Sequence, residues 1–105
     1  MMPYRIEQDS EEVRRARRAF GLAPQEANIL LCLLESKIAM TEVVLEKIGG
    51  PPRDKERARK LLDLLVCRLR KKVAPIEITT VRKNGWTLRP EAKEAVTRIL
   101  AETQP

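Results

Sequence analysis

The stretch Lys60–Val73, KLLDLLVCRLRKKV, constrains the fold more than any other part of the chain. At 3.6 residues per turn it predicts an amphipathic helix, because its apolar and basic residues fall on opposite sides. The side expected to face the core carries Leu62, Val66, Leu69 and Val73, with Leu61 and Leu65 beside them. The opposite line carries Arg57, Lys60, Leu64, Cys67, Arg68 and Lys71, with Arg70 and Lys72 at its flanks. The helix therefore has one face to bury and one basic face to present.

The positive charge of the chain is concentrated in and just before this helix. The 105 residues carry a net charge of +6, and segment 53–72, with nine basic and three acidic residues, accounts for the same +6. Concentrated positive charge favours a polyanionic partner, and a basic helix face that fits the major groove is the minimum for DNA recognition. A charged face that is only solvated is the alternative interpretation.

The composition argues against several other classes of protein. The chain has no histidine, and Cys32 and Cys67 form no CxxC pair, so we expect neither a metal site nor histidine-based catalysis. The sequence contains no phosphate-binding glycine loop, and we expect no enzyme activity and no cofactor. No apolar run reaches the ~18 residues that span a bilayer, and the first residues lack the apolar segment of a signal peptide. We therefore expect a cytoplasmic, nucleoid-associated protein without a membrane partner.

Five helices, one of which contains the stretch Lys60–Val73, and one hairpin are predicted along the chain. Capping residues, apolar spacing, glycines and prolines place the helices at residues 10–20, 24–36, 41–48, 54–73 and 90–102. In helix 24–36 the expected core face comprises Ala27, Leu30, Leu31 and Leu34, widened by Cys32 and Leu33. Residues 76–81 and 86–88 read as two strands joined at Asn84-Gly85, a strong hairpin signal. We expect Trp86 to pack this hairpin against the core.

Helix and hairpin together resemble the winged-helix DNA-binding domain of OmpR/PhoB-type response regulators. GLAPQEANILLCLL, MTEVVLEKIGG, LLDLLVCRLRKKVA and ITTVRKNGWTL are similar, in order, to the opening helix, second helix, recognition helix and wing of that family. The resemblance implies a mainly α (α+β) fold, a winged helix-turn-helix over 22–89 with a C-terminal β-hairpin wing. An N-terminal arm with a basic helix at 1–21 and a C-terminal helix at 90–105 are additions to the family pattern. We also expect no receiver domain, and the wing departs from the family pattern at Lys83 and Trp86.

The resemblance implies sequence-specific binding of double-stranded DNA by a stand-alone bacterial transcriptional regulator. Arg68 is expected to reach base edges, and Leu64 either contacts thymine methyls or is an incidental exposed leucine. Lys60, Arg70, Lys71 and Lys72 would mostly contact phosphates, and the resemblance assigns Arg82 to the minor groove. The residues expected to contact DNA are Lys60, Leu64, Cys67, Arg68, Arg70, Lys71, Lys72, Thr80, Arg82 and Lys83.

Other functions stay open at this point. A winged helix can also act as a protein-interaction module, with RNA polymerase or another regulator as the partner. Nonspecific nucleoid or RNA binding is a third reading. A small single-domain regulator needs a DNA target with two half-sites to bind with useful specificity. We therefore also expect a homodimer or tandem binding. The arginine cluster of helix 10–20 is either a solvated surface or a contact to phosphate or a partner.

Overall fold

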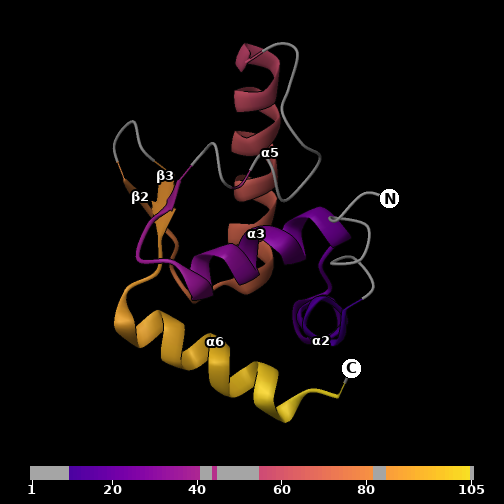
Figure 1. The fold of residues 1–105 in the computed structure, drawn as a ribbon. Coiled ribbons are helices and arrows are strands. Elements are labelled where there is room, and N and C mark those ends of the chain that lie inside the picture. Colours follow the sequence, from indigo (N-terminus) through magenta and orange to yellow (C-terminus); the bar gives the residue numbers. More distant parts are fainter. Residues whose placement is uncertain (1–9, 41–43, 45–54, 82–84, 105) are drawn as a thin grey trace.

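The computed structural model describes residues 10–40, 44, 55–81 and 85–104. Within these residues the order of elements is α2 (Glu11–Phe20), α3 (Pro24–Glu35), β1 (Ala39–Met40), α5 (Lys55–Val73), β2 (Thr79–Val81), β3 (Gly85–Thr87) and α6 (Pro90–Glu102) (Figure 1). Helices make up most of the described residues and one small antiparallel sheet lies at their edge, so the predicted mainly helical α+β class is confirmed (Figure 1). None of the described helices is both long enough and apolar enough to cross a bilayer.

Local sequence signals set the ends of α2. The hydroxyl of Ser10 accepts a hydrogen bond of 3.2 Å from the backbone N–H of Val13, which satisfies one of the open donors of the first turn. The helix ends at Gly21, whose φ of 68° lies in the left-handed region that glycine adopts readily. Both predicted ends of this helix are therefore confirmed.

Helix α3 is the centre of the core, and its buried arc is wider than predicted. Ile29, Leu30 and Leu33 are fully buried, whereas Leu31 and Leu34, which were assigned to the core face, are only half-buried. The reason is that α3 packs against α2 and also against α5. Contact on two sides moves the most buried positions away from those that a single packing face would select.

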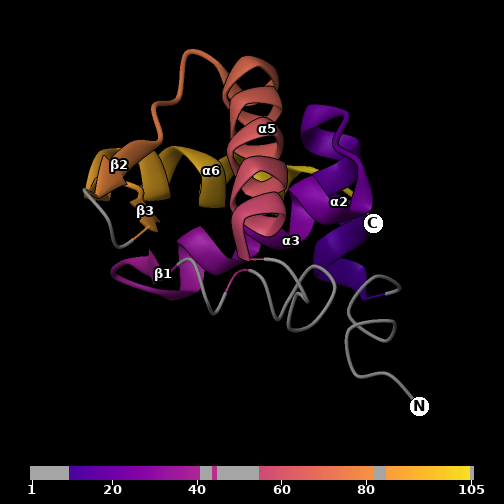
Figure 2. The ribbon, with the colours of Figure 1, turned by 90° about the horizontal axis from the view of Figure 1, so that it is seen from above.

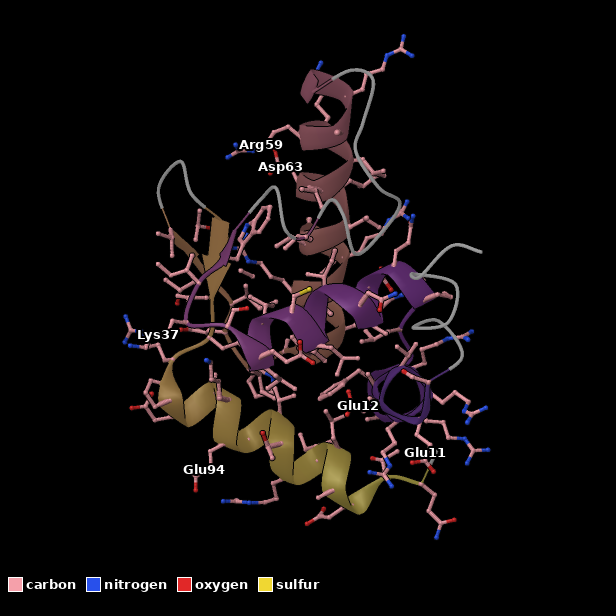
Figure 3. The ribbon with its side chains drawn as sticks, viewed as in Figure 1. Glu11, Glu12, Lys37, Arg59, Asp63 and Glu94 are labelled. Carbon is pink, nitrogen blue, oxygen red and sulfur yellow. The ribbon has the colours of Figure 1, made fainter. Side chains whose placement is uncertain are left out.

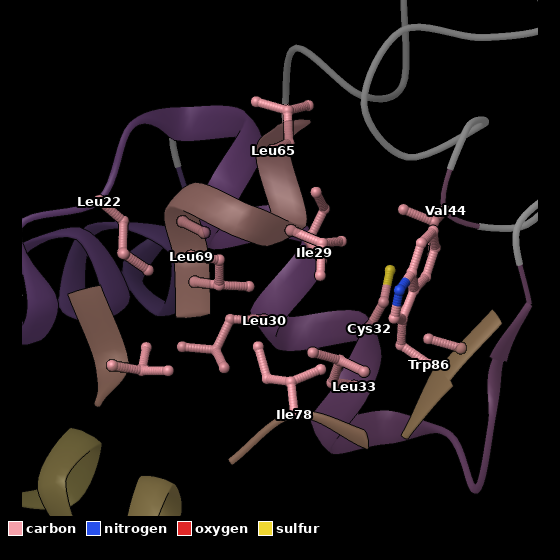
Figure 4. Packing of buried hydrophobic residues seen from close by; sticks show 14 of the residues in the cluster. Leu22, Ile29, Leu30, Cys32, Leu33, Val44, Leu65, Leu69, Ile78 and Trp86 are labelled. Atoms are coloured by element: carbon pink, nitrogen blue, oxygen red, sulfur yellow. The ribbon is translucent and has the colours of Figure 1, made fainter. Parts of the chain in front are cut away.

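The sheet contains three strands, one more than predicted. Strand β3 lies in the middle and pairs antiparallel with β1 and with β2. Trp86 of β3 is opposite Thr80 of β2 and Ala39 of β1. Its side chain is 3% exposed, which confirms that it packs against the core (Figure 4). Strand β1 escaped prediction because two residues are too few to establish an alternating pattern.

Helix α5 presents its apolar stripe to this core. Leu62, Val66, Leu69 and Val73 are buried as expected, and Leu65 joins them (Figure 4). Leu61, which was expected beside the stripe, is instead 42% exposed. One residue advances a helix by about 100°, so Leu61 lies beyond the edge of the arc that α3 covers.

The helices predicted at the two ends of the chain pack onto the same core. Helix α2 contacts α6 as well as α3, and it contributes Val13 and Ala16 to the buried cluster. Helix α6 contributes Val96. Of the short helix predicted at 41–48, only Val44 lies within the described residues, where it is helical and fully buried. The hairpin tip at 82–84 lies outside them.

Candidate nucleic-acid interface

The side of α5 that faces away from the core is basic. Its outward line consists of Arg57, Lys60, Leu64, Cys67, Arg68 and Lys71, and all six residues are exposed, as the helical pattern predicted. The line contains no acidic residue. Asp63 is the one acid between residues 57 and 72, against seven basic residues, and it lies with Arg59 on the side of the helix nearer the hairpin (Figure 3). The outward line thus carries four basic residues and no acid.

One flank of the outward line joins α5 to the hairpin. Arg70 donates from Nη2 to the carbonyl of Ile78 at 3.1 Å and to the hydroxyl of Thr80 at 2.6 Å. Arg70 and Thr80 were both predicted to contact DNA, and the structure brings them into contact with each other. The guanidinium therefore fixes the position of strand β2 against the end of α5.

The other flank joins α5 to the start of α3. Lys72 donates from Nζ to Oε1 of Glu26 at 2.7 Å, in an ion pair whose side chains are 38% and 2% exposed. The same carboxylate oxygen accepts the backbone N–H of Ala23 at 2.8 Å. Lys72 was predicted to contact phosphates, but the structure directs its ammonium to a buried carboxylate. A buried carboxylate needs such a partner, and this explains the difference.

Glu26 stays ionised in this buried position. Burial by itself raises the pKa of its carboxyl group, but the opposing interactions are together larger. The hydrogen bonds from Lys72 and from the Ala23 N–H, with the positive charges of Lys72 and Arg68, hold the pKa below its usual value. The negative charge near Arg68 therefore persists at neutral pH, at the inner edge of the basic line.

Leucines interrupt the basic surface of α5. The side chains of Leu61 and Leu64 are 42% and 47% exposed, and Leu64 lies in the middle of the outward line. Its neighbours one turn away are Lys60 and Arg68. Cys67, on the same line, is an exposed free thiol. Leu64 and Cys67 carry no charge and are shorter than the flanking lysine and arginines, so a partner can approach the helix closely at these positions.

Glu26 was not predicted from the sequence as a site residue, although its position in the first turn of α3 is a recognisable signal. An acid in the first turn of a helix, three residues after Ala23, is the position from which a carboxylate reaches back to the start of the helix. Two other predicted DNA contacts, Arg82 and Lys83, lie outside the described residues. Within those residues, no group of three histidine, cysteine or acidic side chains could hold a metal ion.

Comparison of the chain with protein-family models, with curated proteins and with solved structures found no match in any of the three. The resemblance of its four segments to OmpR/PhoB-type domains therefore stays a prediction.

Proposed function

We propose that the protein binds double-stranded DNA sequence-specifically through the outward face of α5. On this proposal it is a bacterial transcriptional regulator built on a winged helix-turn-helix. The observation that carries the proposal is the acid-free basic line directly opposite a fully buried apolar stripe. A helix that is anchored on one side and carries cations without acids on the other has the shape and charge to enter a major groove.

The dimensions of α5 suit this role. The outward line extends from Arg57 to Lys71, which at a rise of 1.5 Å per residue is about 21 Å. That length covers roughly two thirds of the ~34 Å turn of B-DNA. Lys60 and Lys71 near its two ends would contact phosphates and set the register, and Arg68 between them would donate to guanine. We expect Leu64 to favour sites in which a thymine methyl faces it.

Binding selection from random sequence tests the proposal. Labelled random duplexes are incubated with the protein at near-physiological salt, and the bound fraction is sequenced. We expect an enriched motif that contains A·T pairs, and its loss in Arg68→Ala. A motif with two half-sites would support a homodimer or tandem binding. Binding without enrichment would contradict sequence specificity and point to a nucleoid-type protein.

A protein-interaction module is the second candidate function, with RNA polymerase or another regulator as the partner. The exposed leucines of α5 favour it, because Leu61 and Leu64 are three residues apart and could fit an apolar groove. Titration of labelled protein with purified RNA polymerase, in the wild type and in Leu61→Ser, separates the two candidates. Leu61 lies off the outward line, so this change should weaken a protein contact and leave DNA affinity unchanged.

A further inference from the structure

A small hollow lies between the first turn of α2 and one face of α3. Its volume is about 150 Å³, and the described residues that line it include Glu12 and Val13 of α2 and Asn28, Leu31 and Glu35 of α3. None of the described residues in this lining belongs to α5. Helix α2 lies on the side of α5 away from the β2–β3 hairpin in both views of the fold (Figures 1 and 2). The hollow is therefore separate from the outward line of α5.

Asn28 supplies this hollow with an oxygen acceptor that the fold leaves unused. Asn28 is 4% exposed, and its Nδ2 donates to the carbonyl of Pro24 at 3.1 Å, which fixes the orientation of the amide. Within the described residues, its Oδ1 has no donor. The one fully enclosed side-chain nitrogen or oxygen without a partner in that part of the chain belongs to Arg15, so Oδ1 keeps access to the hollow. An acceptor that is nearly buried and has no donor is unfavourable, and a ligand that donates a hydrogen bond would satisfy it.

Two carboxylates, those of Glu12 and Glu35, line the same hollow and have no cation partner among the described residues. Glu12 lies in the first turn of α2, where the helix dipole favours a negative charge. Glu35 is the last residue of α3, where the dipole disfavours it, and the last turn of α3 contains no basic residue. Lys93 of α6 contacts this end of α3, but its ammonium donates to the carbonyl of Ser36 at 2.8 Å. A cation in the hollow would therefore offset a charge that α3 itself leaves uncompensated.

The acceptors of the hollow match an ammonium group better than a metal ion. An ammonium has three N–H donors and no acceptor, and the two carboxylates and the Asn28 amide supply three acceptors. Ca²⁺ takes about 6–8 oxygen ligands, and within the described residues no group of three histidine, cysteine or acidic side chains could hold a metal ion. Val13 is buried and Leu31 is half-buried, so the hollow also has an apolar wall along which the methylene chain of an amine can lie.

We propose that this hollow binds the ammonium group of an alkylamine, with its N–H groups directed at Glu12, Asn28 and Glu35. The volume is below the ~300 Å³ at which sites for drug-sized ligands begin, so the hollow admits the charged end of a chain and not a large molecule. A free polyamine and a lysine side chain of another protein share this end group. The proposal does not depend on DNA binding by α5.

Titration of the ¹⁵N-labelled chain with n-butylammonium chloride, followed by NMR, tests the site. The resonances to follow are the side-chain and backbone amides of Asn28. The net charge of +6 repels cations, so saturable binding of this probe requires a local site. n-Butanol, which has the same chain without the charge, should leave these resonances unchanged.

The test variant is Glu35→Gln, which removes an unfavourable charge from the end of α3 and should melt, by circular dichroism, at or above the wild-type temperature. The matched control is Glu102→Gln, because Glu102 is the exposed last residue of α6 as Glu35 is of α3. We expect wild type and control to bind n-butylammonium alike, and the test variant to bind at least five times more weakly. Glu12→Gln, on the other helix, should weaken binding as well.

Three outcomes would overturn the proposal. One is that the Asn28 resonances of the wild type show no saturable shift with n-butylammonium in the millimolar range. Another is that Glu35→Gln and Glu102→Gln lose affinity equally, since binding would then reflect net charge alone. The last is that CaCl₂ shifts the same resonances at lower concentration than n-butylammonium and Glu35→Gln abolishes that effect, which would assign the hollow to a metal ion.

Two further probes identify the source of the amine. Spermidine represents a free polyamine, and Nα-acetyl-lysine methylamide represents a lysine within a protein chain. Tighter binding of spermidine supports a site for a free polyamine, and tighter binding of the blocked lysine supports a contact with a partner protein. Failure of both to shift the Asn28 resonances would overturn the proposal.

Discussion

Replacement of Glu26 by glutamine should destabilise the protein by an amount that its partners determine. The side chain is almost completely buried, and its Oε1 accepts both the Ala23 N–H and the Lys72 ammonium. Glutamine keeps the shape and one oxygen, but it removes the charge. A hydrogen bond to a charged group contributes about 1.5–3 kcal/mol. Because the Lys72 side chain is 38% exposed and regains water, we expect a loss of about 1–2 kcal/mol.

The opposite replacement, Lys72→Met, should cost more. It leaves a carboxylate whose side chain is 2% exposed without its cation, whereas Glu26→Gln leaves a lysine that can turn to solvent. Removing one partner of a buried pair typically costs about 3–5 kcal/mol when the remaining charge stays buried. The structure therefore predicts an asymmetry between the two single variants. A charge–charge interaction at the surface would not produce it.

The pH dependence has a defined sign. The pKa of Glu26 is lowered in the folded protein, so the unfolded chain binds more protons in the acid range. The contribution of this carboxylate to stability is present above the unfolded pKa of about 4.3 and is lost as the pH falls through the lower, folded pKa. The Glu26→Gln variant has no carboxylate here, so its stability should not show this loss in the acid range. Lys72→Met raises the pKa of Glu26 and should flatten the same part of the curve.

Urea denaturation followed by circular dichroism measures these effects, at pH 7 and across the acid range. The double variant completes a mutant cycle and isolates the coupling between the two residues. Glu94→Gln is the control, because Glu94 is exposed and pairs with Arg98 at 3.6 Å on the surface of α6. We expect no measurable change there. Equal costs for the two single variants, or no coupling in the cycle, would refute the role given to the buried carboxylate.

Four further substitutions test other features of the molecule. Lys71→Ala should weaken binding to specific and random DNA alike, and it should lower the slope of log binding constant against log salt concentration by about one unit. Lys72→Ala should leave that slope unchanged. Fluorescence anisotropy across a salt series measures both. Arg70→Met removes one hydrogen bond to Ile78, just before β2, and one to Thr80 of β2. It should lower the free energy of unfolding by about 1 kcal/mol and speed hydrogen exchange more at Thr80 than at α5 amides. Gly21→Ala should lower the free energy of unfolding by about 1 kcal/mol, because alanine is strained in the left-handed backbone conformation of this position. A Cβ would meet no atom there, so no steric clash adds to this cost. An unchanged midpoint in urea denaturation would contradict this.

The parts of the fold that follow local rules could be predicted from the sequence. The ends of α2 follow from a hydroxyl cap and a glycine, and α6 begins at Pro90 and ends at Glu102 as expected. The wide buried arc of α3 depends on two neighbours that are distant in sequence, and no periodicity within the helix reports them. Strand β1 depends on its partner β3 in the same way.

Prediction from periodicity has the same limit at the candidate interface. Periodicity placed Lys60, Leu64 and Arg68 on an exposed face, and the structure agrees. Periodicity could not separate cations that face solvent from cations that the fold itself uses. Lys72 and Arg70 are exposed by area, and only their partners on α3 and β2 reveal a structural role.

These two flanking cations determine how the outward face of α5 is held. Arg70 ties the last turns of the helix to β2, and Lys72, two residues later and on the other side, ties them to Glu26 at the start of α3. With the apolar stripe buried between them, rotation of α5 about its axis would break one of these contacts in either direction. On the proposed function, Arg68 and Lys71 therefore meet the groove with their orientation already set, and little ordering entropy is lost on binding. Loss of either flanking contact should reduce specificity more than overall affinity, because phosphate contacts tolerate a rotated helix and base contacts do not.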